Sequence, residues 1–126
     1  MPEPTRHDLE KYHDNLEIVH LTAKQISKDF AMFGMEITFS GNVVFAYPEL
    51  MMQLTQHLQL LLQTDQERLF ALMYQIDVDQ KSVGNCLRSH KNPASGLADL
   101  IIRREMLKVL TVQYFKNLKK NPDPNV

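Results

Sequence analysis

Residues 5–33 read TRHDLEKYHDNLEIVHLTAKQISKDFAMF, and this stretch decides the fold. Its apolar side chains recur three and four residues apart, which is typical of the seam of a coiled coil or helical bundle. They are Leu9, Tyr12, Leu16, Val19, Ala23, Ile26, Phe30 and Phe33. Because such a helix is marginal alone in water, its seam must be buried against other parts of the chain. The sequence therefore predicts a long first helix, capped by Thr5 and ended by Gly34.

The stretch after this helix changes to a strand-like composition. Residues 36–39 and 43–47 are rich in β-branched and aromatic side chains, and Ser40-Gly41-Asn42 between them is a turn signal. This pattern predicts a short β-hairpin between the first and second helices. Because two strands alone are marginal, the hairpin must pack on the helices or pair with another chain.

Two further helices follow the predicted hairpin. Pro48 suits a first helical position and opens a second helix. Its inward-facing side chains are Leu50, Met51, Leu54, Leu58 and Leu61. Thr64-Asp65-Gln66-Glu67 has the form of a capping box, so a third helix is predicted for residues 65–76. The side chains that this helix presents to the core are Leu69, Phe70, Leu72, Met73 and Ile76.

The last part of the chain predicts two more helices. Asp79 can cap a fourth helix that reaches residue 89 and buries Val83, Cys86 and Leu87. Asn92-Pro93 begins a final helix that runs to about residue 117 and is apolar on most sides. A helix of that kind is either central to the core or shared with a partner. The predicted fold is a mainly α bundle of four to five helices with one short β-hairpin, in a single domain of residues 1–126 whose ends, 1–4 and 118–126, are disordered.

Composition places the chain among ordinary globular domains. It has 126 residues, of which 44% are hydrophobic and 23% charged, with a formal net charge of −1. This charge gives no electrostatic case for binding nucleic acid or an anionic membrane. Residues 1–10 lack the apolar core of a signal peptide, and the single cysteine, Cys86, cannot form an internal disulfide. We therefore expect a cytoplasmic protein without a membrane segment.

Two Glu-x-x-His patterns lie on the predicted first helix, and helical metal sites use this pattern. They are Glu10-x-x-His13 and Glu17-x-x-His20. The two histidines share a face but lie about 10 Å apart, which is too far to bind one ion together. Each would need further ligands, for which Asp14, Glu17 and, on another helix, His57 are the candidates. We expect no inward-facing glutamate on the other helices. A metal-binding helical enzyme is thus one alternative, and histidines at the surface are the other.

Nucleophilic catalysis has one candidate pair. Cys86 is followed four residues later by His90, so the two side chains can lie side by side on a helix. The simpler interpretation is a small cysteine on an apolar face. We therefore predict no catalytic residue and no cofactor.

Residues 72–87, LMYQIDVDQKSVGNCL, have the spacing of two helices joined by a tight turn. The stretch resembles the helix-turn-helix of repressor-type DNA-binding proteins, in which apolar residues flank a turn residue and a polar cap precedes the second helix. The matching residues are Ile76, Asp77, Val78, Asp79, Val83 and Leu87. Met73 stands where the family has a small residue, and Asp77 where it has glycine.

The resemblance implies a DNA-binding regulator that uses residues 66–89. The side chains that would face the groove are Gln80, Lys81, Asn85 and Arg88, whose types can read base edges. However, the formal charges of residues 65–91 cancel, whereas a protein that binds several phosphates needs an excess of positive charge.

The surplus of apolar positions favours a different function. The first helix has a complete seam, the last helix is apolar on most sides, and no convincing catalytic set is present. We therefore predict a small cytoplasmic helical domain that acts through protein–protein contacts, as a homodimer or with another protein. DNA binding and metal-dependent catalysis are the alternatives.

Overall fold

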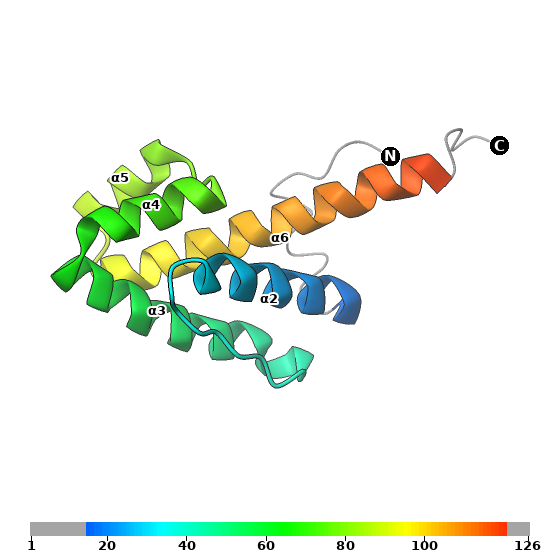
Figure 1. Ribbon diagram of the computed structural model, residues 1–126, viewed down its shortest axis with the longest axis horizontal. Coiled ribbons are helices and arrows are strands. Elements are labelled where there is room, and N and C mark those ends of the chain that lie inside the picture. The colour runs from blue at the N-terminus through cyan, green and yellow to red at the C-terminus, as the bar shows by residue number, and fades with distance from the viewer. Residues whose placement is uncertain (1–14, 121–126) are drawn as a thin grey trace.

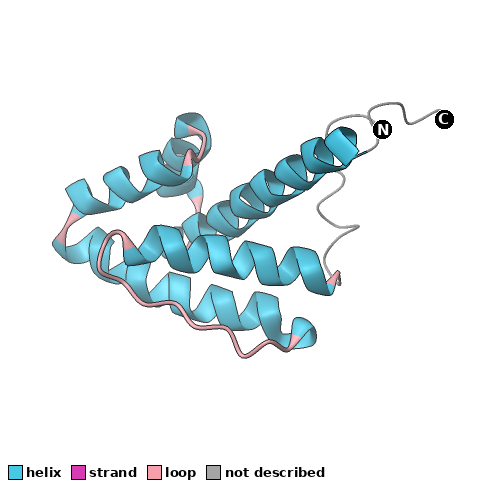
Figure 2. Ribbon diagram, turned by 45° about the vertical axis from the view of Figure 1, so that its right-hand side comes forward, coloured by secondary structure: helices cyan, strands magenta, loops and turns pink. Residues whose placement is uncertain are grey.

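The computed structural model describes residues 15–120, and this part of the chain is built from helices. They are α2 (Leu16–Ala31), the short 3-10 helix η1 (Val43–Phe45), α3 (Ala46–Thr64), α4 (Gln66–Ile76), α5 (Gln80–Ser89) and α6 (Pro93–Lys120). Both α2 and α3 pack against α6, while α4 and α5 gather near the end where α6 begins (Figure 1). The other end of α6 extends beyond the remaining helices (Figure 2).

The core forms around α6, which contacts each of the other four α-helices. Its apolar composition on most sides therefore reflects a central position for most of its length. The fully buried large apolar side chains come from α2, α3, α4 and α6: Ile26, Phe30, Leu54, Leu58, Leu69, Leu72, Ile76, Leu97 and Ile101. A second cluster joins Ile18 of α2 to Met106, Val109 and Leu110 of α6. No residue of α6 beyond Leu110 is buried in the described part of the chain.

The first helix is shorter than predicted. α2 begins at Leu16, because Asn15 is extended and its side chain accepts a hydrogen bond from the Ile18 amide at 3.1 Å. The prediction of one continuous helix through Asn15 is therefore wrong, while Thr5, Leu9 and Tyr12 lie outside the described residues. α2 ends at Ala31, two residues before the predicted end at Phe33, and Gly34 lies in the turn that follows, with a φ of +76° that suits glycine.

The predicted hairpin of residues 36–39 and 43–47 is also wrong, because the described residues contain no β-strand. Residues 35–39 do alternate in burial as a strand would, with Met35 and Ile37 inward. Their hydrogen bonds, however, go to the two flanking helices: the Ile37 carbonyl accepts from the Ser27 hydroxyl of α2 at 3.1 Å, and Thr38 is bonded to a side chain of α3. Gln53 accepts from the Thr38 amide at 2.9 Å and donates to the Thr38 carbonyl at 2.7 Å. The carboxylate of Glu49 accepts from the Ser40 amide in the same way, at 2.6 Å.

The second predicted strand forms η1 and the start of α3. The side chain of Asn42 accepts a hydrogen bond from the Val44 amide at 3.0 Å, which starts a tight turn. α3 then begins at Ala46, so Pro48 occupies its third position and not its first. The second half of the predicted hairpin is helical because this local cap outweighs the β-branched composition.

The remaining helix boundaries lie close to those predicted. The capping box at Thr64 is wrong, because Thr64 is the last residue of α3, its hydroxyl donates to the Leu60 carbonyl, and Asp65 caps α4 instead. Asp79 caps α5, and the Asn92 side chain accepts from the Ser95 amide at the start of α6. The four predicted inward leucines of α3 are buried, and so is Val83 of α5. Cys86 and Leu87 are half-buried, and Phe70 is exposed. α6 continues to Lys120, so residues 118–120 are helical; residues 1–4 and 121–126, predicted as disordered, lie outside the described part.

Candidate functional site

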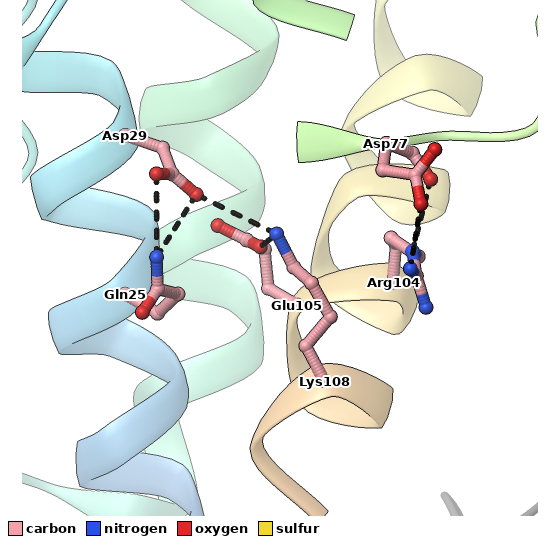
Figure 3. Close-up of polar contacts among 6 residues, drawn as sticks. All are labelled: Gln25, Asp29, Asp77, Arg104, Glu105 and Lys108. Atoms are coloured by element: carbon pink, nitrogen blue, oxygen red, sulfur yellow. Dashed lines mark hydrogen bonds and ion pairs between the residues drawn. The ribbon is translucent and has the colours of Figure 1, made fainter. Parts of the chain in front are cut away.

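The turn between α4 and α5 is held by an unusual residue. Asp77 adopts the left-handed conformation, with a φ of 67°, which aspartate tolerates better than most residues. Arg104 of α6 fixes this turn: its Nε donates to the Asp77 carbonyl and its Nη2 to the Asp77 carboxylate, both at 2.9 Å (Figure 3). The polar contacts therefore tie the α4–α5 corner to the central helix.

A groove of about 880 Å³ lies between α4 and α5 beside this turn. Its lining is mostly apolar: Phe70, Met73, Tyr74, Val78, Val83, Gly84 and Leu87, together with Asp77, Asp79 and Gln80. Tyr74 is 82% exposed and Phe70 48% exposed, so two aromatic rings stand at its surface. We call this surface the α4–α5 groove.

A second depression, of about 360 Å³, adjoins the α4–α5 groove. The two share Val78 and Asp79, and the second continues over the outer side of α6 to Leu107. Asp79 accepts hydrogen bonds from the amide and hydroxyl of Ser82, and these bonds lower the pKa of its carboxyl. The α4–α5 groove has aspartates at its turn, whereas the second depression is lined by both acidic and basic side chains, Asp79, Asp99, Arg103 and Arg104.

The residues predicted to read DNA all lie on α5. Gln80, Lys81, Asn85 and Arg88 are exposed, and Arg88 donates to the side chain of Asn85 at 2.7 Å. The structure therefore places them on one helix, outside the apolar core.

The predicted metal ligands are not brought together. His20 is exposed and its ring lies 5.2 Å from that of Phe39, whereas His57 lies 3.1 Å from the Glu36 carbonyl. The His57 ring packs near Phe30, which is ten residues further along α2 than His20, or roughly 15 Å. Both histidines thus position the segment between α2 and α3.

The other members of the predicted metal site give no cluster. Glu17 is exposed on α2, and Glu10, His13 and Asp14 lie outside the described residues. Within residues 15–120, no group of three histidine, cysteine or acidic side chains is placed to hold a metal ion.

Cys86 and His90 do lie close together, on the side of α5 that faces α6. A Cβ built on Gly96 of α6 would come within 2.5 Å of the Cys86 sulfur and 2.8 Å of His90 Cδ2. The Cys86 thiol is directed at the Pro93 carbonyl, 3.6 Å away, and burial raises the pKa of the thiol. A raised pKa lowers the thiolate fraction at neutral pH, so this pair is suited to packing rather than to nucleophilic attack.

A polar pocket of about 460 Å³ near Cys86 is a feature that the sequence analysis missed. The Tyr47 hydroxyl of α3 donates to Asp99 of α6 at 2.5 Å, and Arg103 pairs with the same carboxylate at 2.9 Å. Burial, followed by the bond to Asp99, raises the pKa of Tyr47 to about 12. The phenol therefore stays protonated at neutral pH and joins α3 to α6.

A buried charged cluster between α2 and α6 was also missed (Figure 3). Asp29 and Glu105 are both buried, which corrects the expectation that the other helices carry no inward glutamate. Lys108 contacts Glu105 and lies 3.8 Å from Asp29, while Gln25 donates to Asp29 at 3.2 Å. The sequence spacing could have predicted that Glu105 is buried, because it is four residues from both Ile101 and Val109 and so lies on the buried face of α6.

Protonation explains how this cluster is tolerated inside the protein. Burial, followed by the hydrogen bond to Asp29, raises the pKa of Glu105 to about 8, although Lys108 acts in the opposite direction. Glu105 is therefore mainly uncharged at neutral pH, which reduces the charge that is buried beside Asp29 and Lys108. The acidic side of the cluster is closed to solvent, and Lys108 contacts Glu105 from the half-buried side.

The end of α6 forms a second exposed apolar surface. Val112 and Phe115 are each 51% exposed, and the Phe115 ring packs edge-on against Tyr114 at 5.1 Å. Lys116 and Lys119 are exposed beside them, and the sequence has no acidic residue between positions 106 and 120. We call residues 111–120 the α6 tail.

Comparison with the models of known protein families, with curated proteins and with solved structures found no match. In the described part of the chain, no helix combines the length and apolar character needed to cross a membrane.

Proposed function

We propose that this protein is a cytoplasmic interaction domain that forms a homodimer. In this proposal the α4–α5 groove of each chain binds the other copy. The observation that carries the proposal is the pair of exposed aromatic rings, Phe70 and Tyr74, at the rim of an apolar groove. Aromatic side chains are enriched at protein interfaces, and exposed apolar patches mark binding surfaces.

The polar clusters support a binding role over a catalytic one. Tyr47, Asp99 and Arg103 join α3 to α6, and the Asp29–Glu105–Lys108 cluster lies in the interior. Each uses its polar groups in contacts between helices. The α4–α5 groove, in contrast, offers an open apolar surface.

Light scattering on a sizing column, at a series of protein concentrations, tests this proposal. We expect twice the chain mass at high concentration and a shift toward the single-chain mass on dilution. A single-chain mass at every concentration, together with no binding of a hydrophobic dye, would contradict the homodimer.

DNA binding by α5 is a second candidate, favoured by the geometry of the turn. Asp77 has the left-handed conformation that glycine supplies in the repressor-type motif, and Lys81, Asn85 and Arg88 lie exposed on the following helix. A gel-shift titration with random duplex DNA at low salt is the test. We expect binding that weakens steeply as salt is raised, and the absence of any shift at low salt would exclude this function.

A further inference from the structure

The α6 tail and the α4–α5 groove are matched in chemistry. The tail presents Val112 and Phe115 with Lys116 and Lys119 beside them. The groove is apolar at its centre, and its lining contains two aspartates but no lysine or arginine. Arg104 offsets the charge of Asp77, so Asp79 provides most of the acidic character. The apolar side chains of the α6 tail, with lysines beside them, thus match the apolar lining of the α4–α5 groove, which has Asp79 beside it.

The tail cannot reach the groove of its own chain. α6 runs straight (Figure 1), and the α4–α5 turn is bonded to Arg104 near the middle of this helix. Phe115 is eleven residues, or roughly 16 Å, further along the same helix. The tail lies at the opposite end, beyond the other described helices. Only a second molecule can bring the two surfaces together.

Two-fold symmetry provides a closed arrangement of two such molecules. If two α6 helices run antiparallel, the tail of each lies near the start of the other, where α4 and α5 are found. The depression that joins the α4–α5 groove to Leu107 would give the apolar side chains of the incoming tail a continuous path along α6. Its arginines, Arg103 and Arg104, are paired with Asp99 and Asp77. Both contacts are then identical, so the assembly stops at two chains and does not extend into a filament.

We propose that the homodimer forms by reciprocal exchange of α6 tails, with Phe115 of each chain seated in the α4–α5 groove of the other. This inference rests on the proposed homodimer and names its contact surfaces. Burial of Phe115 against Phe70 and Tyr74 supplies the apolar contact, and Lys116 and Lys119 lie toward the acidic turn that contains Asp79.

Two variants test the two surfaces separately. Phe115→Ser removes the tail anchor, and the double variant Phe70→Ser/Tyr74→Ser removes the groove aromatics. All three side chains are at least 48% exposed, so the folded monomer should be retained, which circular dichroism checks. We expect each variant to raise the dimer dissociation constant at least about ten-fold. Leu60→Ser on α3 is the matched control, because Leu60 is 57% exposed outside both surfaces, and it should leave the dimer unchanged.

Mixing the two variants gives the decisive result. A mixed dimer contains one intact contact, between the tail of the groove variant and the groove of the tail variant. The mixture should therefore associate more tightly than either variant alone, as light scattering or sedimentation measures. If wild-type protein is dimeric but the variants dimerise normally, or mixing restores nothing, the exchange is wrong while the homodimer stands. If wild-type protein is monomeric throughout, both proposals fail.

Discussion

The titration of one buried carboxyl, Glu105, should be visible in the stability of the whole protein. Its pKa is about 8 in the folded state and near 4.5 in the unfolded chain. Between these values the folded state binds more protons than the unfolded state, so the free energy of unfolding decreases as pH rises from about 4.5 to about 8. The contribution of Glu105 is fully present below this window and lost above it.

Glu105→Gln removes this titration and keeps the shape of the side chain. We expect its stability to vary less between pH 5 and pH 8 than that of the wild type, as measured by urea unfolding at three pH values. Glu67→Gln, at an exposed position of α4, is the control and should follow the wild-type curve. Parallel curves for wild type and Glu105→Gln would show that Glu105 does not titrate in this window.

At the scale of elements, the contact between α5 and α6 depends on the absence of one side chain. Gly96→Ala would place a methyl group 2.5 Å from the Cys86 sulfur, so α5 and α6 would have to separate locally. We expect a loss of about 1–3 kcal/mol, despite the better helix propensity of alanine.

Gly84→Ala is the matched variant on the facing helix. Its new methyl group would meet only the mobile end of Arg88, at 3.2 Å, so we expect a gain of about 0.5–1 kcal/mol from helix propensity. Thermal or urea unfolding measures both. Equal changes of the same sign would contradict a steric role for Gly96.

The segment between α2 and α3 is held by Gln53 in place of a neighbouring strand. Gln53→Ala removes both hydrogen bonds to the Thr38 backbone. Gln53→Glu keeps the acceptor for the Thr38 amide, but it replaces the donor to the Thr38 carbonyl with a second oxygen, so that hydrogen bond is lost. We expect both variants to speed hydrogen exchange at the Thr38 amide at least about ten-fold, because the local opening free energy falls. Gln56→Ala, an exposed neighbour on α3, should not change it. Unchanged exchange in both Gln53 variants would show that the apolar side chains alone hold the segment.

The elements that the sequence predicted well are those with local causes. Asp65, Asp79 and Asn92 each cap an amide three residues ahead, so the signal and the contact lie in the same short stretch. The hairpin failed because the partner of Thr38 is a side chain on a different element, Gln53, and strand composition cannot reveal that.

The site features show the same division between local and distant causes. The inward position of Glu105 is visible in the spacing of apolar residues along α6. Whether its carboxyl group can be buried depends on Asp29, which lies on a helix far away in the sequence. The α4–α5 groove depends on how two helices diverge at Asp77. The exposed end of α6 depends on where the other helices stop, although its apolar composition is evident in the sequence.

For the whole molecule, α6 connects the core to the proposed dimer contact. Residues 94–110 of this helix include its buried positions, and the tail follows without a break. Because only the folded chain presents both surfaces, dimerisation should stabilise the fold by mass action. We expect the midpoint of thermal unfolding to rise with concentration for the wild type, and the same rise to need at least about ten-fold higher concentrations of Phe115→Ser. A concentration-independent midpoint in both would contradict this coupling.

The buried Asp29–Glu105–Lys108 cluster also affects how α6 is rotated about its axis and how far it is shifted along that axis relative to α2. A helix that is apolar on most sides could pack in several rotations at similar free energy, and slipping by one turn would preserve most of its contacts. A slipped α6 would leave Asp29 and Glu105 buried without their partners, which costs far more than a misplaced leucine. The cluster thus favours one packing register of α6 over registers in which the helix is shifted or rotated. Joint replacement of Asp29 and Glu105 by leucine should keep the helix content but broaden the amide NMR spectrum, and a spectrum as sharp as that of the wild type would show that apolar packing alone sets the register.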